Sequence, residues 1–163
     1  MPRNVLFVCT GNSCRSILAE ALGNAMPRRN FRAFSAGWRP EGYVNPFAIA
    51  VLDDLLVPHD KLRSKSWHVF ATSGAPAMAA VITLCDAAAR EVMPMWNGNP
   101  VCAHWGMADP FKASGTHAEI KAAYRETSRI LEVRLAAFRA LDLAAMARSE
   151  LGSTLMAIGE APV

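Results

Sequence analysis

The sequence predicts an α/β fold, in which helices pack on both faces of a doubly wound sheet of four parallel strands. Short continuous apolar runs, typical of strands buried on both faces, alternate with segments of helical periodicity. The chain has 163 residues, the length of one domain. Right-handed crossovers between parallel strands restrict the connections to a doubly wound layout. We expect one domain over residues 1–150 and a C-terminal tail over residues 151–163.

The N-terminal half reads as strand, helix, strand, helix. Residues 4–9 (NVLFVC) form a continuous apolar run rich in β-branched side chains, which predicts a buried strand. Residues 16–26 repeat apolar side chains at helical spacing until Pro27 ends the pattern. A short strand is expected over residues 32–36, and a second helix over residues 46–56.

The C-terminal half continues the alternation. Residues 66–71 have a serine available as a helix cap and predict one or two helical turns. Residues 80–85 (AVITLC) predict a third buried strand, and residues 99–104 a weaker fourth. Between residues 119 and 141 a largely apolar stripe recurs every three or four positions, which predicts a long helix that covers the sheet. We expect Gly152 to end the last helix.

Composition narrows the possible classes of function. Apolar residues make up 52% of the chain and charged residues 19%, which excludes a mostly disordered chain. The net charge of +3 is too small to indicate a nucleic acid as the main partner. The longest nearly apolar stretch, residues 77–85, is far shorter than the ~20 residues of a membrane-spanning helix. Residues 1–5 show no signal-peptide pattern, so we expect a cytoplasmic protein without a membrane partner.

The loop between the first strand and the first helix carries the clearest chemistry. It reads CTGNSCRS, so that five residues separate Cys9 from Arg15. Such a loop can curl around an anion at a helix N-terminus, where unpaired N–H groups and the helix dipole favour negative charge. The planar guanidinium of Arg15 matches two oxygens of a tetrahedral oxyanion. We expect the oxyanion to be bound by Thr10, Gly11, Asn12, Ser13, Cys14 and Arg15.

The same surroundings suit a reactive sulfur on Cys9. A helix N-terminus and a nearby arginine can lower a thiol pKa from ~8.5 to about 3.5–7.5. Ser16 can donate to the sulfur and stabilise it as a leaving group, and Asn12 tolerates a left-handed backbone. A cysteine that merely ends a core strand is the simpler interpretation, but the strand–loop–helix context argues against it. We expect the side chain of Cys14 to pack beneath the loop.

Two further residues are expected beside this loop. Cys85 ends the third predicted strand, and Asp109 follows the fourth by a few residues. Ligands of doubly wound sheets bind outside the carboxyl ends of the strands, so both residues should lie at the same edge of the sheet as Cys9.

These segments resemble the low-molecular-weight protein tyrosine phosphatase superfamily and, within it, the thioredoxin-coupled arsenate reductases. The resemblance extends from about residue 4 to residue 141 and implies that superfamily's fold. The segments that carry it are residues 5–16 (VLFVCTGNSCRS), 35–37 (SAG), 63–67 (RSKSW), 83–86 (TLCD), 104–106 (HWG) and 109–110 (DP).

The resemblance implies a role for each matching residue. Cys9 would attack phosphorus or arsenic, and Asp109 would be the general acid, although a turn cap beside Pro110 is its simpler role. Cys85 would attack the Cys9–arsenic adduct, leaving arsenite and a Cys9–Cys85 disulfide; alternatively it is a buried core cysteine. His104 is expected to shape the end of its strand.

Met93 departs from the pattern of the thioredoxin-coupled enzymes, which have a third cysteine at this position. A thioether cannot form a disulfide, so the usual relay is impossible. Thioredoxin or glutaredoxin could reduce the Cys9–Cys85 disulfide directly, a low-molecular thiol could resolve the adduct, or Cys14 or Cys102 could substitute. A fourth possibility is that the protein no longer reduces arsenate.

The resemblance also suggests a potassium ion held by Asn12, Glu20 and Ser35, although Glu20 could instead pair with an arginine; no other metal or cofactor is expected. Arsenate reduction is the leading hypothesis, because Cys85 favours it. Hydrolysis of phosphotyrosine or small phosphoesters through a phosphocysteine is the alternative. A non-catalytic oxyanion sensor is the third possibility.

Overall fold

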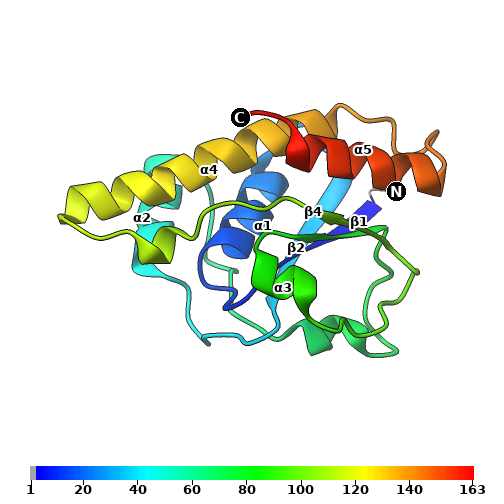
Figure 1. Ribbon diagram of the computed structural model, residues 1–163, viewed down its shortest axis with the longest axis horizontal. Helices are drawn as coiled ribbons and strands as arrows, with labels where there is room; N and C mark the ends of the chain where they lie inside the picture. The colour runs from blue at the N-terminus through cyan, green and yellow to red at the C-terminus, as the bar shows by residue number, and fades with distance from the viewer. Residues whose placement is uncertain (1–2) are drawn as a thin grey trace.

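The computed structural model describes residues 3–163. A parallel sheet lies in the middle of the molecule, between helices and loops (Figure 1). The strands are β1 (Arg3–Cys9), β2 (Phe31–Gly37), β3 (Ala80–Thr83) and β4 (Val101–His104). They form one four-stranded sheet in the order β2-β1-β3-β4, and every neighbouring pair is parallel, so the predicted sheet is confirmed. Met1 and Pro2, part of the stretch without a signal-peptide pattern, lie outside the described residues.

The helices follow the predicted order, with two short additions and with the C-terminal residues forming a separate helix, α5, that was not predicted. The helical elements are α1 (Arg15–Ala25), α2 (Pro46–Asp54), η1 (Trp67–Ala71), α3 (Asp86–Arg90), η2 (Pro110–Lys112), α4 (His117–Arg139) and α5 (Arg148–Glu160). Both additions, α3 and η2, are too short to produce a periodic pattern. Within residues 3–163, no helix has the length and apolar character needed to cross a bilayer.

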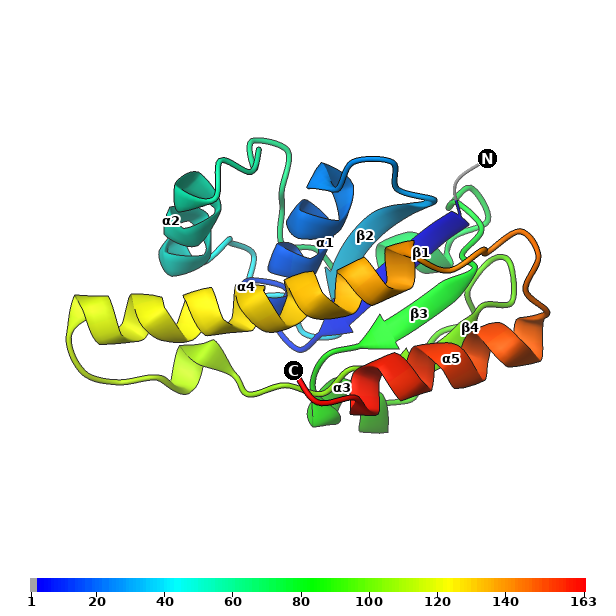
Figure 2. The same cartoon turned by 90° about the horizontal axis from the view of Figure 1, so that it is seen from above.

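The three longest helices share one face of the sheet (Figure 2). Gly23 of α1 lies against Phe31 and Ala33 of β2, and Phe31 packs on Phe138 of α4 with ring centroids 4.7 Å apart. Val101, in the same cross-strand row as Ala33, lies against α5.

The opposite face of the sheet is covered more lightly. Phe34, the next residue along β2, points to this side and contacts Phe70 of η1 edge to face, with ring centroids 5.6 Å apart. The short helix η1 and its flanking loops thus provide the second helical layer. The layout leaves the loops after β1 and β3 free to meet at the carboxyl edge, where the strand order reverses.

The prediction that Gly152 ends the last helix is wrong, because α5 continues through it to Glu160. A Cβ at Gly152 would lie 3.7 Å from Val101, an ordinary van der Waals contact, so α5 packs on β4 at this point without requiring a glycine. Leu155 is fully buried, and its carbonyl accepts a 2.8 Å hydrogen bond from the indole N–H of Trp105. The boundary expected at residue 150 falls inside α5, and the segment expected as a tail forms most of that helix.

Arg134 is the charged exception in the apolar stripe of α4, and it is buried. Its guanidinium donates to the carbonyls of Trp105, Gly106 and Gly159, over distances of 3.0, 3.2 and 3.0 Å. A buried charge is tolerated only where such hydrogen bonds compensate it. Arg134 therefore fixes the chain that follows β4 against both α4 and α5.

Candidate active site

The loop between β1 and α1 is held in shape from inside by Asn12. This residue has a positive φ of 47°, the left-handed conformation expected for it. Its side-chain amide donates to Ser16 Oγ at 2.8 Å and to Ser35 Oγ at 3.0 Å, and its carbonyl oxygen accepts from the Lys65 backbone N–H at 2.9 Å. Asn12 is completely buried, so these contacts fix the loop before any ligand binds.

Gly37 at the end of β2 allows the loop to approach the sheet. A Cβ at this position would lie 2.5 Å from the carbonyl oxygen of Thr10 and 3.0 Å from the backbone nitrogen of Asn12. No side chain fits there, so position 37 requires glycine.

The sulfur of Cys9 lies at the base of the loop, 2.8 Å from Ser16 Oγ. Because the Asn12 amide donates to that oxygen, the hydroxyl proton of Ser16 is free to point at the sulfur. Both residues are buried, with Cys9 only 3% exposed. The structure therefore brings together the sulfur and the serine donor that the sequence predicted.

Burial raises the pKa of the Cys9 thiol. The hydrogen bonds from Ser16 and the backbone, and the charge of Arg15, act in the opposite direction. The predicted stabilising contacts are thus present, but the predicted lowering of the pKa is wrong, because desolvation of the sulfur outweighs them. Sequence patterns do not reveal how completely a loop covers its own cysteine.

Arg15 begins α1 and reaches across the loop to Asp109. Its Nη2 lies 3.4 Å from Asp109 Oδ2, and its Nη1 donates to the carbonyl of Met107 at 3.4 Å. The other carboxylate oxygen of Asp109 accepts from the backbone N–H of Phe111 at 3.1 Å, so Asp109 also caps η2. The two roles considered for Asp109, site residue and turn cap, are compatible.

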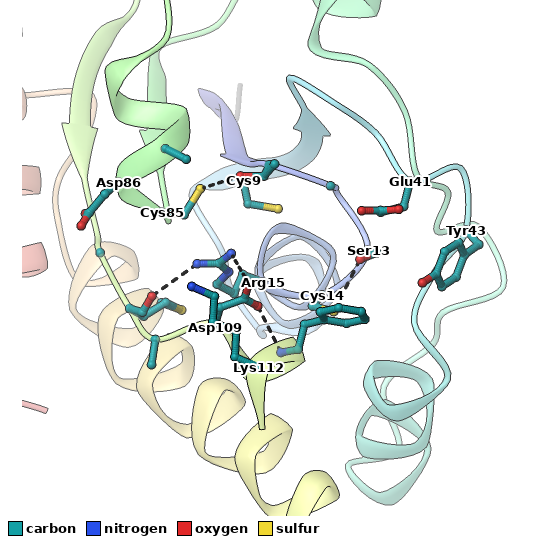
Figure 3. A pocket seen from close by; sticks show the side chains of 17 residues that line it. Cys9, Ser13, Cys14, Arg15, Glu41, Tyr43, Cys85, Asp86, Asp109 and Lys112 are labelled. Atoms are coloured by element: carbon teal, nitrogen blue, oxygen red, sulfur yellow. Dashed lines mark hydrogen bonds and ion pairs between the residues drawn. The ribbon is translucent and has the colours of Figure 1, made fainter. Parts of the chain in front are cut away.

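These residues line an open pocket of ≈ 710 Å³ at the carboxyl edge of the sheet (Figure 3). Cys9, Arg15, Cys85 and Asp109 all contribute to its wall, so the structure brings the predicted residues together. Glu41, Tyr43 and Lys112 also line the pocket but were not predicted. They lie on loops or 3₁₀ turns, where no periodicity indicates which side chains face a site.

Cys85 lies between β3 and α3, directly beside the loop. It is 6% exposed, and its sulfur is 3.4 Å from the hydroxyl of Thr10, the residue that follows Cys9. Free thiols at this edge therefore come from the end of β1 and from the segment that follows β3, as the parallel sheet predicted.

The other two cysteines are placed less favourably for a role in the reaction. The sulfur of Cys14 lies 3.4 Å from the buried hydroxyl of Tyr124 on α4, as expected for a side chain packed beneath the loop. Burial and, to a smaller extent, the hydrogen bond with Cys14 raise the pKa of Tyr124, so this hydroxyl stays protonated. Cys102 is exposed on β4 and does not line the pocket.

The expected potassium ligands come together, but a lysine lies among them. Ser35 Oγ donates to the carboxylate of Glu20, and the ammonium of Lys65 lies 3.5 Å from both Glu20 Oε2 and Ser35 Oγ. Asn12 turns its amide N–H₂, a donor that cannot bind a cation, towards Ser35. Lys65 thus supplies the positive charge that the carboxylate requires, in place of the arginine considered for Glu20. Within residues 3–163, no group of three or more His, Cys, Asp or Glu side chains is arranged to hold a metal ion.

Comparison with known proteins agrees with this arrangement. The chain matches the family model for low molecular weight phosphotyrosine protein phosphatases over residues 4–149. It is 34% identical over 134 residues to the arsenate reductase of Halalkalibacterium halodurans, covering 82% of this chain and 93% of that protein.

Solved structures show the same fold. The crystal structure of arsenate reductase from Archaeoglobus fulgidus is 26% identical, with a TM-score of 0.57 over 78% of this chain and 98% of that one. Vibrio vulnificus Wzb, solved in complex with benzylphosphonate, is 18% identical, with a TM-score of 0.65 over 85% of this chain and 98% of that one. With its Cys-x5-Arg loop, buried thiol and facing aspartate, the chain belongs to the low molecular weight phosphotyrosine protein phosphatase family.

Proposed function

We propose that the protein is an arsenate reductase that uses Cys9 as nucleophile and Cys85 as resolving thiol. One observation carries this proposal: a second thiol, Cys85, opens into the pocket of the nucleophile and is hydrogen-bonded to Thr10, the neighbour of Cys9. Hydrolysis of a phosphoester needs no such thiol. The identity with curated arsenate reductases supports the same choice.

Oxyanion binding begins with the loop and Arg15. The N-terminal end of α1 has no side-chain cap, so backbone N–H groups other than that of Ser16, which is directed at the Cys9 sulfur, are available to the oxyanion. Arg15 would exchange its contacts with Asp109 and the Met107 carbonyl for two oxygens of the ligand, in the bidentate geometry that guanidinium groups favour.

In the first chemical step the Cys9 sulfur bonds to arsenic. Dihydrogen arsenate and the thiol combine, one As–O bond breaks, and water leaves, with Asp109 donating a proton to the departing oxygen. The thiol proton passes to the oxyanion, which offsets the raised pKa of Cys9. Ser16 stabilises the negative charge that develops on the sulfur.

In the second step the Cys85 thiolate attacks the Cys9 sulfur. The S–S bond forms, the S–As bond breaks, and its electron pair stays on arsenic. Arsenic is thereby reduced from As(V) to As(III), the two sulfurs together lose two electrons, and arsenite leaves after taking up protons. Thr10 positions the attacking sulfur through its hydroxyl.

A thiol reductant must then reopen the Cys9–Cys85 disulfide. Met93 is half-buried against the core and cannot pass the disulfide outward, so thioredoxin, glutaredoxin or a low-molecular thiol would attack it directly in the pocket. We place the reaction in the cytoplasm, where such reductants are maintained, and the four free cysteines support this location.

Phosphatase activity is the second candidate, and the family match favours it. Cys9, Arg15 and Asp109 suffice for it, because water can hydrolyse a phosphocysteine without a second thiol. The two candidates therefore share the first step and differ only at Cys85.

The deciding experiment measures arsenate turnover with thioredoxin, glutaredoxin and glutathione in parallel, beside hydrolysis of an aryl phosphate. The proposal predicts arsenite formation with at least one reductant, and its loss in Cys9→Ser. Aryl phosphate hydrolysis without arsenite formation from any reductant would favour the phosphatase instead.

A further inference from the structure

His104 connects the ends of two strands to the residue that follows Cys85. At the end of β4, its Nδ1 lies 2.7 Å from the hydroxyl of Thr83 on β3. Its Nε2 lies 2.9 Å from Oδ1 of Asp86, the first residue of α3. One imidazole ring therefore joins β3, β4 and the start of α3.

The direction of the second hydrogen bond follows from its acceptor. A carboxylate only accepts hydrogen bonds, so Nε2 of His104 carries the proton and donates to Asp86. The Thr83 hydroxyl can either donate or accept, and it satisfies Nδ1 in either protonation state of the ring. The imidazole is thus oriented by Thr83 and presents a fixed N–H to Asp86.

The side of this contact that carries His104 is rigid. The Trp105 backbone N–H donates to the Thr83 carbonyl at 2.8 Å, and that of Met107 to the Leu84 carbonyl at 3.3 Å. The guanidinium of Arg134 on α4 donates hydrogen bonds to the carbonyls of Trp105 and Gly106. The segment with His104 is therefore fixed to β3 and α4.

The side that carries Cys85 is held by backbone hydrogen bonds and by the buried Leu84 and Ala88, but by few side-chain hydrogen bonds. Helix α3 has only five residues, and its N-cap, Cys85, makes no side-chain capping hydrogen bond. The sulfur of Cys85 has a single polar side-chain contact, the 3.4 Å hydrogen bond with Thr10. The bond between His104 and Asp86 is the one side-chain hydrogen bond or ion pair that fastens α3 itself within the described residues.

Gly106 leaves room for this contact. A Cβ at Gly106 would lie 2.8 Å from His104 Nε2 and 3.6 Å from Asp86 Oδ1, close to the hydrogen bond itself. A side chain there would push the imidazole away from the carboxylate. This close approach shows that the space around the contact between His104 and Asp86 is confined.

We propose that His104 is a positioning residue for the resolving thiol: through Asp86 it holds the start of α3 so that the Cys85 sulfur faces Cys9. This inference rests on the proposed role of Cys85. Its physical basis is orientation, since two thiols react rapidly only when their sulfurs are held near the geometry of attack. His104 does not contact the reacting atoms and leaves the oxyanion loop untouched.

The first test separates the two steps of the reaction. His104→Ala should lower kcat for arsenate about tenfold, because Cys85 then samples unproductive positions. The KM for arsenate and the turnover of an aryl phosphate should not change, since both depend on the loop. His104→Gln, whose amide can still donate to Asp86, should restore most of the kcat, whereas a purely structural loss would affect both substrates.

The second test does not require arsenate. The thiol oxidant diamide accepts two electrons and two protons as Cys9 and Cys85 form their disulfide, which peptide mass mapping quantifies. We expect disulfide formation to slow about tenfold in His104→Ala and in Asp86→Ala, and no further in the double variant, because both changes remove one interaction. Wild-type protein that forms the disulfide with diamide but produces no arsenite would contradict the proposed function and not this inference.

Two outcomes would overturn the inference. Disulfide formation in His104→Ala at the wild-type rate would show that Cys85 is positioned without His104. An equal loss of arsenate and aryl phosphate turnover would show that His104 supports the whole site. Circular dichroism and the unfolding temperature of each variant identify a general loss of folding, and His104→Gln then provides the comparison.

Discussion

Replacing Ser16 with alanine removes the hydroxyl that lies 2.8 Å from the Cys9 sulfur. The Ser16 side chain is completely buried, and its hydrogen bond lowers the pKa of Cys9 against the effect of burial. A hydrogen bond to a charged group contributes roughly 1.5–3 kcal/mol, and ~1.4 kcal/mol corresponds to one pKa unit. Ser16→Ala should therefore raise the pKa of Cys9 by a further ~1–2 units.

The pH dependence of Cys9 alkylation by iodoacetamide measures this shift. Only the thiolate reacts, so the reaction rate rises with pH through the pKa of the thiol. In Ser16→Ala the midpoint should move to higher pH, and the rate below both midpoints should fall by roughly 10–100-fold. Cys9 and Cys14 share one tryptic peptide, and fragmentation of that peptide by tandem mass spectrometry resolves Cys9 from Cys14.

Two controls make the result specific. Cys102 is exposed on β4 and should react at the same rate in both proteins. Ser153→Ala removes a hydroxyl that bonds only to carbonyls of its own helix, and it should leave the Cys9 profile unchanged. An unchanged Cys9 midpoint in Ser16→Ala would refute the claim that this hydroxyl stabilises the thiolate.

Four further changes test other parts of the account. Cys85→Ser should stop arsenite release and spare aryl phosphate hydrolysis; equal loss of both would contradict the division of roles. Met93→Cys restores a third cysteine, so arsenate turnover with thioredoxin should rise; an unchanged rate would indicate another route for the reductant. The single variant Lys65→Met leaves the Glu20 carboxylate without its ion-pair partner, whereas the double variant Lys65→Met/Glu20→Gln removes both charges. The single variant should therefore have the lower unfolding temperature, because removing both partners of an ion pair costs less than removing one. Leu155→Ala should lower the free energy of unfolding by ~2–5 kcal/mol in urea titrations, and a loss near zero would contradict the packing of α5.

The sheet and the loop could be predicted because their signals are local. The apolar run of β1 and the Cys-x5-Arg spacing are visible in adjacent residues, and the left-handed conformation of Asn12 follows from its residue type. Parallel topology then places Cys85 beside Cys9 without any knowledge of side-chain contacts. The functional residues that the sequence identified lie at the carboxyl ends of strands or in the loops and helices that follow them.

Tertiary packing decides the features that the sequence did not reveal. Gly152 lowers helix propensity by ~1 kcal/mol, yet the burial of Leu155 keeps α5 intact through it. The place of Lys65 beside Glu20, and that of His104 beside Asp86, depend on residues far apart in the chain. The raised pKa of Cys9 depends on how deeply the finished fold covers the sulfur.

The central claim is that Cys9 and Cys85 together reduce one oxyanion. The most direct measurement is a single turnover: reduced protein is mixed with arsenate in the absence of added thiol, and both arsenite and disulfides are quantified. We expect one arsenite per chain and a Cys9–Cys85 disulfide found by peptide mass mapping. Arsenite formation with both of these thiols still reduced, or a disulfide that joins Cys9 to Cys14 instead, would contradict it.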